Sequence, residues 1–257
     1  EADEIAPYLI FTIRNSDGEI VRRIKRSASP GIHRFNWGLR RFNMYPVTKA
    51  GSTMHDKQTG GIPVPPGKYY VQMSKVVNGI ETILVEQQIF TVKRLNNLSL
   101  PAEDPIALEK FKKEAAEVYG VTVGLTRYVD EMIKNLKALR TALIHGGGST
   151  QEDMIRVDEY IFEYREMKRI LSGDEIIQKM NENQPPDLNW RISAVTYGAF
   201  HGSDATQTLK DNLQLVKTEV KALIEDAKVL DKKVQLLKKS ANSAGSPWSP
   251  GRLPDFK

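Results

Sequence analysis

The hydrophobic pattern of this chain changes its period near residue 100. Over residues 1–98 the apolar side chains form short β-rich runs bounded by turn residues, whereas over residues 99–244 they recur every three or four positions. The first pattern is typical of strands and the second of amphipathic helices. We therefore predict an α+β chain of two domains, followed by an extended tail over residues 245–257.

Two hairpins are predicted in the β-rich half. Asp17-Gly18 and Asn78-Gly79 each separate two alternating runs, and such pairs favour turns in which both residues have positive φ. The segment "GIHRFNWGLR", residues 31–40, predicts a further strand that places Ile32, Phe35 and Trp37 in the core. Short strands without helical pattern between them favour an antiparallel β-sandwich of the immunoglobulin type.

A long loop is expected between these strands. Residues 43–64 are rich in Gly, Pro, Thr and Ser, and they include Tyr45, His55 and Asp56. A loop of this length is either functional or a disordered crossing between sheets, and the sequence leaves both interpretations open.

The helical half contains two stripes before a Pro-Pro break at residues 185–186. Thr150 and Asp153 predict a capping box at the start of the second helix, which runs to about residue 172. A short helix is expected around Trp190–Tyr197. The first stripe consists of Leu108, Phe111, Ala115, Val118, Thr122, Leu125, Val129, Met132, Leu136, Leu139 and Leu143.

The last helix has the clearest pattern. Four heptads of a/d spacing run through Leu209, Leu213, Val216, Val220, Leu223, Ala227, Leu230, Val234 and Leu237. Further apolar side chains widen this stripe beyond a two-stranded seam: Leu215, Ala222, Ile224, Val229 and Leu236. A wide apolar face favours an antiparallel bundle of three or four helices within the chain over an intermolecular coiled coil.

The tail "SAGSPWSPGRLPDFK" contains prolines, a tryptophan and an arginine, which a solvated, frayed terminus would not need. Gly245 is expected to end the helix, and three prolines reduce the entropy that docking would cost. Trp248 is predicted to be buried, since burying a large apolar side chain contributes about 1.5–3 kcal/mol. Arg252 is expected to reach nearby carbonyls or carboxylates. Both are candidate interaction residues.

Charge is distributed unevenly. Residues 1–98 carry 14 Lys and Arg against 8 Asp and Glu, and residues 99–257 carry 23 against 24. Arg22, Arg23, Lys25 and Arg26 form one basic run, but no aromatic residue lies among them. A solvated strand therefore explains the run better than a nucleic-acid surface does.

No group in the sequence is arranged for chemistry. The chain lacks cysteine, and "GGGST" at residues 146–150 follows a helix and lacks a phosphate-binding lysine, so we interpret it as a turn. Asp153, Asp158 and Glu159 are expected to form surface ion pairs. The four histidines have no partner at helical spacing: His33, His55, His145 and His201. We predict no catalytic, cofactor-binding or metal-binding residue.

Two observations concern the context of the chain. It begins "EADEIAPY", without an initiator Met or an apolar signal segment, so we expect a piece of something longer. No apolar run approaches the roughly 18 residues that a membrane-spanning helix needs.

Several stretches together resemble a known family. "PYLIFTIRNSDGEIVRRI", "GIHRFNWGLR", "VPPGKYYVQM", the helical region and "AGSPWSPGRLPDF" are similar to the C-terminal region of bacterial sortilin-like, BNR-repeat β-propeller proteins often labelled glycosyl hydrolases. Members often have threonine where this chain has Ser249. The resemblance implies an immunoglobulin-like domain over residues 1–98, a helical domain over residues 99–244, and export to the periplasm or cell surface. Any catalytic site would lie in the propeller.

The favoured function is a non-catalytic structural and interaction module. Its partner would be the propeller of the parent protein or another protein, with no cofactor and no membrane span. A carbohydrate-binding or glycosidase accessory role is the alternative, in which exposed Tyr45, Tyr69 or Tyr70 would stack on sugar rings. Nucleic-acid binding through the basic β half is a second alternative.

Overall fold

The computed structural model of the chain describes residues 5–47, 61–95, 99–199 and 202–254. Within these ranges four strands come first and five helices follow, so the chain is an α+β protein with two parts, as predicted. It divides into two compact units. The first, which we call the sheet unit, comprises residues 1–117 and 197–205, and the second, the helical unit, comprises residues 118–196 and 206–257.

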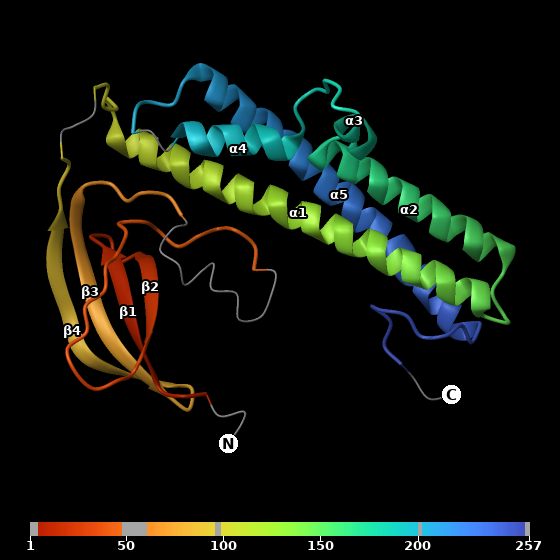
Figure 1. The fold of residues 1–257 in the computed structure, drawn as a ribbon, viewed down its shortest axis with the longest axis horizontal. Coiled ribbons are helices and arrows are strands. Elements are labelled where there is room, and N and C mark those ends of the chain that lie inside the picture. The colour runs from red at the N-terminus through yellow and green to blue at the C-terminus, as the bar shows by residue number, and fades with distance from the viewer. Residues whose placement is uncertain (1–4, 48–60, 96–98, 200–201, 255–257) are drawn as a thin grey trace. The chain divides into compact units, whose positions relative to one another are not determined.

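The sheet unit is built on one antiparallel sheet with the strand order β2-β1-β3-β4 (Figure 1). Both predicted hairpins are confirmed. Asn78 and Gly79 have φ of 50° and 79°, as expected, but in the first turn only Gly18 has a positive φ. The strands are β1 (Tyr8–Asn15), β2 (Ile20–Ser27), β3 (Gly67–Val77) and β4 (Ile80–Val92).

The strand predicted over residues 31–40 is wrong. This segment is irregular, and Arg40 makes only an isolated bridge with Pro63. Ile32 is fully exposed, so its predicted place in the core is also wrong. Phe35 and Trp37 do pack, partly buried, against a small core of Ile13, Val21, Ile24 and Tyr69. Their rings contribute to the core although their backbone belongs to none of the strands that the structure describes.

The four described strands form a single sheet. A sandwich requires two sheets that face each other, and the described residues supply no second one. The predicted immunoglobulin-type sandwich is therefore not established by this fold, whereas the antiparallel four-stranded sheet is.

The helices match the predicted segments closely. The first predicted stripe lies in α1, the capping box begins α2, the segment around Trp190 is α4, and the heptad stripe is α5. The helices are α1 (Pro105–His145), α2 (Gln151–Ser172), α3 (Glu175–Lys179), α4 (Leu188–Ala199) and α5 (Gln207–Ser243).

In the helical unit, α1, α2 and α5 lie alongside one another (Figure 1). Arg140 of α1 pairs with Asp158 of α2 at 2.6 Å and Asp130 pairs with Lys168 at 3.0 Å, so these two helices run antiparallel. The Ser240 hydroxyl of α5 donates to Asp153 of α2 at 3.1 Å and Lys233 lies 3.6 Å from Glu163, so α5 runs antiparallel to α2 as well. The a/d positions of α5 from Leu213 to Leu237 are all buried, which confirms the predicted stripe.

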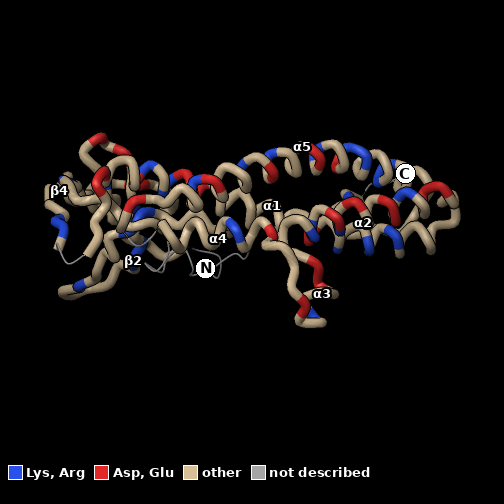
Figure 2. The backbone as a smooth tube through the Cα atoms, turned by 90° about the horizontal axis from the view of Figure 1, so that it is seen from above, with Lys and Arg blue, Asp and Glu red and all other residues tan. Residues whose placement is uncertain are grey.

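The residues thought to widen the α5 stripe behave differently. Leu215, Val229 and Leu236 are 38%, 55% and 66% exposed, so they do not extend the buried face. Lysines alternate with Asp and Glu along the same helix (Figure 2). The buried face of α5 is therefore the narrow a/d stripe, and the prediction of a wider apolar face is wrong.

The capping box at α2 is confirmed. The Thr150 side chain accepts a hydrogen bond from the Asp153 N–H, and the Asp153 carboxylate accepts one from the Thr150 N–H at 3.1 Å. Burial opposes ionisation of Asp153, but the hydrogen bonds from Thr150 and Ser240 outweigh it and lower the pKa of this carboxyl. Asp153 is therefore a structural cap, as the capping-box prediction indicated, whereas its predicted surface ion pair is wrong, because Asp153 is 4% exposed and is bonded to Thr150 and Ser240.

Candidate functional site

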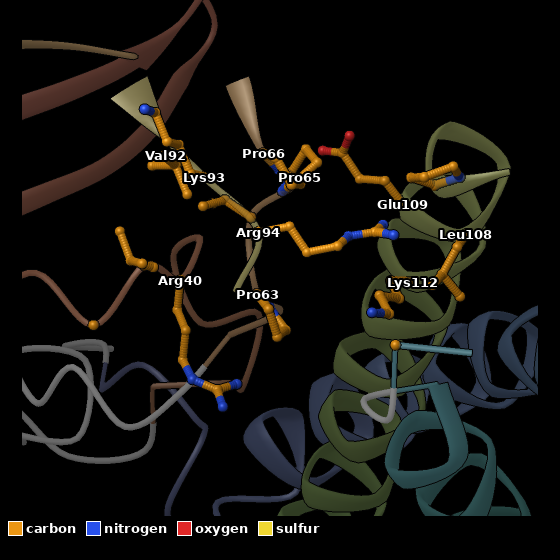
Figure 3. A pocket seen from close by; sticks show the side chains of 15 residues that line it. Arg40, Pro63, Pro65, Pro66, Val92, Lys93, Arg94, Leu108, Glu109 and Lys112 are labelled. Atoms are coloured by element: carbon orange, nitrogen blue, oxygen red, sulfur yellow. The ribbon is translucent and has the colours of Figure 1, made fainter. Parts of the chain in front are cut away.

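A cavity in the sheet unit carries the clearest concentration of unusual chemistry. Its volume is about 300 Å³, at the lower end of the range for ligand pockets. Figure 3 shows it between the loop of Arg40, the end of β4 and the first turns of α1. We call it the basic pocket. Its charged lining residues are Arg40, Lys93, Arg94, Lys112 and Glu109.

Hydrogen bonds between residues 39–41 and 61–64 hold Arg40 at the pocket. The Arg41 N–H donates to Ile62 O at 2.9 Å, and the Val64 N–H donates to Leu39 O at 2.9 Å. The Arg40 guanidinium donates to Gly61 O at 2.9 Å. Gly61 has a φ of 85°, and an added Cβ would lie 2.1 Å from the Arg41 carbonyl oxygen, so only glycine allows these two segments to approach so closely.

An ion-pair network fixes the start of α1 in this unit. Arg41 is buried, and its guanidinium lies 2.7 Å from Glu109 and 3.2 Å from Glu19. Lys113 lies within 3.5 Å of the same two carboxylates. Burial opposes the ionised form of Glu19, yet Arg41 and Lys113 together lower the pKa of its carboxyl. The Glu109 charge is therefore compensated by partners outside the pocket.

Lys112 is the most unusual residue of the pocket. It is only 8% exposed, and among the described residues its ammonium has no hydrogen bond or ion pair. Burial lowers its pKa, the Arg40 charge lowers it further, and Glu109 opposes the shift. The Arg94 guanidinium, which also has no such partner in the described ranges, extends toward α1 beside it (Figure 3). A cation buried without a partner is costly, and such residues often mark binding sites.

Lys112 could have been noticed in the sequence, because it occupies a position of the helical pattern that is expected to be buried, but it was not included among the predicted core positions. Lys112 lies four residues after Leu108 and three before Ala115, both of which are buried. A lysine at a buried position of an amphipathic helix breaks the pattern. Neither Arg40 nor Arg94 carried a comparable local signal, because the pocket joins segments far apart in the chain.

A second feature of the sheet unit is the outer edge of β4. This strand is at the end of the sheet, and no described strand pairs with its free side. Its residues from Ile80 to Ile89 are all exposed. They include five large apolar side chains, namely Ile80, Ile83, Leu84, Val85 and Ile89.

The two edges of the sheet differ in protection. At the opposite edge the Phe42 N–H donates to Val21 O at 3.0 Å, so a loop covers part of β2. Natural edge strands are commonly guarded by Lys, Pro, bulges or covering segments. β4 contains no Lys, Arg or Pro, and its pairing with β3 shifts register twice, between Val71 and Met73 and between Met73 and Ser74. β4 is therefore a long, apolar edge strand that bulges but carries no guarding cation or proline.

The tyrosines predicted to bind sugars are not gathered into one surface. Tyr69 is 3% exposed and its hydroxyl donates to Pro65 O at 2.7 Å, so its predicted role as an exposed platform is wrong. Tyr70 follows it on β3 and points to the opposite face of the sheet. Tyr45 lies partly buried in the loop after Arg41. His55 and Asp56 lie outside the described residues.

The basic run on β2 does not form one solvated face. Arg23 and Lys25 are exposed, but Arg22 is 3% exposed and its guanidinium donates to Arg41 O at 3.0 Å. The expectation of a solvated strand is thus wrong for Arg22. Because one of the four cations supports a loop, the run loses much of the continuous basic surface that nucleic-acid binding would use.

The C-terminal tail forms a compact clamp in the helical unit. Arg252 is 8% exposed, and its guanidinium donates to Asn242 Oδ1 at 2.7 Å, Pro247 O at 2.6 Å and Ser246 O at 3.3 Å. The Ser246 hydroxyl lies 3.0 Å from that of Ser149. Gly148 matches this closeness, since an added Cβ would lie 2.7 Å from Ala244 O. The expected reach of Arg252 to carbonyls is confirmed.

Trp248 corrects the predicted mode of anchoring. Its side chain is 47% exposed, not buried, and the Arg252 guanidinium lies over its ring at 5.0 Å from the centroid. The sequence suggested the larger apolar residue as the anchor. The structure instead buries the arginine, because its five N–H donors can satisfy several carbonyls at once.

The helical unit also holds a cavity of about 290 Å³ near the ends of α2 and α4. Its polar groups are paired locally: the Asp174 N–H donates to Gln184 Oε1 at 2.9 Å, and the Asp174 carboxylate caps α3. Arg191 donates to Asn212 at 2.9 Å. With these groups already bonded, the cavity offers less to a ligand than the basic pocket does.

Within the ranges that the structure describes, no group of three or more His, Cys, Asp or Glu side chains is placed to hold a metal ion. His33 bonds locally, with Nε2 3.2 Å from the Ser29 hydroxyl. His201 lies outside the described residues. Among the described helices, none combines the length and the apolar character that a membrane span requires.

Comparisons with known proteins add no family. No family model matches this chain, and neither a curated protein nor a solved structure matches it.

Proposed function

We propose that this chain is a non-catalytic interaction module whose docking surface is the free edge of β4. The proposal includes the origin that the resemblance implies, namely the C-terminal part of an exported β-propeller protein at the bacterial periplasm or cell surface. Immunoglobulin-like and bundle descriptions of the two units stay predictions within it, because a sandwich would need a second sheet beyond the four described strands.

One observation carries the proposal: ten consecutive residues of an edge strand, Ile80 to Ile89, are exposed and half of them are large and apolar. The outward backbone N–H and C=O groups of such an edge can pair with an added strand. An edge of this length and composition is an aggregation hazard unless something covers it. A partner strand would remove the hazard and supply the binding energy.

Charge indicates what the partner strand contains. Glu81 and Glu86 are the only charged residues of β4. Opposite charges across a strand pair are favourable and like charges are unfavourable. We therefore expect a segment with apolar and basic side chains. A second copy of β4 fits less well, because it would add two further carboxylates and no cation.

The experiment uses an amidated peptide of sequence KVTVKVT, with EVTVEVT as its charge-reversed counterpart. Hydrogen exchange of the whole chain would be measured with and without each peptide. We expect KVTVKVT to protect the β4 amides at least about tenfold more than EVTVEVT does. Leu84→Lys, which places a guarding charge on the edge, should abolish this protection, whereas Leu253→Lys on the exposed tail should leave it unchanged.

Three outcomes would count against the proposal. Equal protection by both peptides would contradict the charge argument, and absence of β4 protection by either would contradict the docking edge. Protection that rises with protein concentration alone would identify a second copy as the occupant. Hydrolysis of aryl-glycosides by the isolated chain, lost on substitution of one carboxylate, would overturn the non-catalytic assignment.

A further inference from the structure

We infer that the basic pocket of the sheet unit is a binding site for a carboxylate attached to a small apolar body. The inference does not depend on docking at β4. It rests on the burial of Lys112, on the charges that surround the cavity and on the composition of its walls.

The first step concerns the charge balance. Four cationic residues line the pocket and Glu109 is its one lining carboxylate. That carboxylate already accepts from Arg41 at 2.7 Å and lies 3.5 Å from Lys113. The Lys112 ammonium and the Arg94 guanidinium have no hydrogen bond or ion pair within the described part of the chain. An entering anion would supply the partner that a buried ammonium lacks.

The second step selects the kind of anion. Pro63, Pro65, Pro66 and Pro105 line the pocket, and proline has no backbone N–H. Phosphate sites typically surround the anion with several backbone N–H groups. Here the donors are side chains, and the planar fork of Arg94 matches the two oxygens of a carboxylate.

The third step concerns the rest of the ligand. The proline rings, Val92 and Leu108 give the cavity apolar walls. Its volume of about 300 Å³ suits a small ring or a short aliphatic chain. A free organic acid and an acidic or C-terminal residue of a partner polypeptide share this chemistry, and the experiment separates them.

Benzoate is the first probe, and benzamide is its neutral isostere. Titrations of the full chain, followed by the NMR signal of the Lys112 ε-methylene, should show that benzoate binds at least about tenfold more tightly than benzamide. Binding should also raise the Lys112 pKa, because a neighbouring anion favours the charged ammonium. Lys112→Met should weaken benzoate at least about tenfold.

Lys110→Met is the matched control, since Lys110 lies two residues away on α1, is exposed and does not line the pocket. It should leave benzoate binding unchanged. Arg94→Gln provides a second test that does not alter α1, and a loss of binding there should parallel that of Lys112→Met. A single cooperative melting transition would show that each variant is folded.

The two ligand sources are separated by a pentapeptide with a free C-terminal carboxylate and its amidated form. Tighter binding of the free-carboxylate peptide than of benzoate would assign the pocket to a partner polypeptide, and the reverse order would assign it to a small acid. Either result supports a carboxylate site. Equal affinity for benzoate and benzamide, tighter binding of phenyl phosphate, or no effect of Lys112→Met would overturn it. Leu84→Lys should not alter benzoate binding, so failure here and failure of the β4 proposal are distinguishable.

Discussion

The two units use their apolar side chains in different ways. In the helical unit the a/d stripe of α5 is buried from Leu213 to Leu237, and the tail is held down by Arg252. In the sheet unit the buried core of the sheet is small, and β4 leaves large apolar side chains exposed. The helical unit also has exposed apolar side chains, such as Phe162 and Trp190, but they are spread over several helices, whereas five of those in the sheet unit follow one another along a single edge strand.

The same contrast holds for buried charge. Arg252 in the helical unit is surrounded by carbonyl and amide oxygens that accept hydrogen bonds from its guanidinium. Lys112 in the sheet unit is equally buried, without such acceptors among the described residues. A satisfied buried cation stabilises a fold, and an unsatisfied one indicates a ligand.

The largest expected effect tests the closed core of the helical unit. Leu230→Ala should lower the free energy of unfolding by about 2–5 kcal/mol, because Leu230 is 1% exposed and its truncation leaves a cavity. Leu236→Ala, the same change on the same helix at a 66% exposed position, should cost about 0.5 kcal/mol or less. Urea denaturation of both variants measures the difference. Similar costs would contradict the narrow buried face of α5.

The next effect tests which tail residue is the anchor. Arg252→Ala should cost about 2 kcal/mol, because it leaves several buried acceptors without a donor. Trp248→Ala should cost about 1 kcal/mol or less, since its side chain is half exposed. Thermal unfolding of each variant and of the chain lacking residues 245–257 provides the comparison. A larger loss of stability for Trp248→Ala than for Arg252→Ala would show that the tryptophan anchors the tail.

A pH titration tests the core of the sheet unit. Burial, with a contribution from Glu109, raises the pKa of Tyr69 to about 12, while Arg41 opposes the shift. The neutral form is therefore favoured in the folded state, and this stability is complete below pH 10 and lost as the pH rises from 10 toward 12. Tyr69→Phe should remove that part of the alkaline loss while costing about 1 kcal/mol at pH 7 through its hydrogen bond to Pro65. Identical alkaline profiles would show that Tyr69 is accessible.

The smallest effect tests the cost of the unpaired lysine. Lys112→Met should raise the free energy of unfolding by about 1 kcal/mol at pH 7, because it removes a buried charge and keeps the side-chain volume. The folded-state pKa of Lys112 is lowered, so the penalty is present at neutral pH and declines as the pH rises from that pKa toward 10.5. The stability gained by Lys112→Met should therefore decrease over the same pH range, and urea denaturation at several pH values measures it. Destabilisation by Lys112→Met at pH 7 would mean that the ammonium has a partner.

Local patterns in the sequence predicted most of the fold. The stripes of α1, α2 and α5, the Thr150 cap and both hairpins follow from periods and turn residues that lie within a few positions of one another. The strand prediction for residues 31–40 failed because their alternation resembled a strand, although among the described residues their backbone makes only one isolated bridge, from Arg40 to Pro63.

The candidate sites were less accessible to the same reasoning. Tyr69 and Trp248 were assigned by residue type, and the structure reverses their exposure: Tyr69 is buried and Trp248 is half exposed. The basic pocket is formed by residues near positions 40, 64, 93 and 112. No local sequence pattern predicts that these four segments lie close together.

By itself, the sequence determined where the long helices and the two hairpins form and which a/d stripe of α5 is buried, because these properties depend on neighbours along the chain. Tertiary structure alone decided that β4 has an open edge, that Lys112 is buried beside a cavity and that Arg252 anchors the tail. Exposure, pairing and charge compensation depend on segments distant in sequence, so they exist only once the chain has folded.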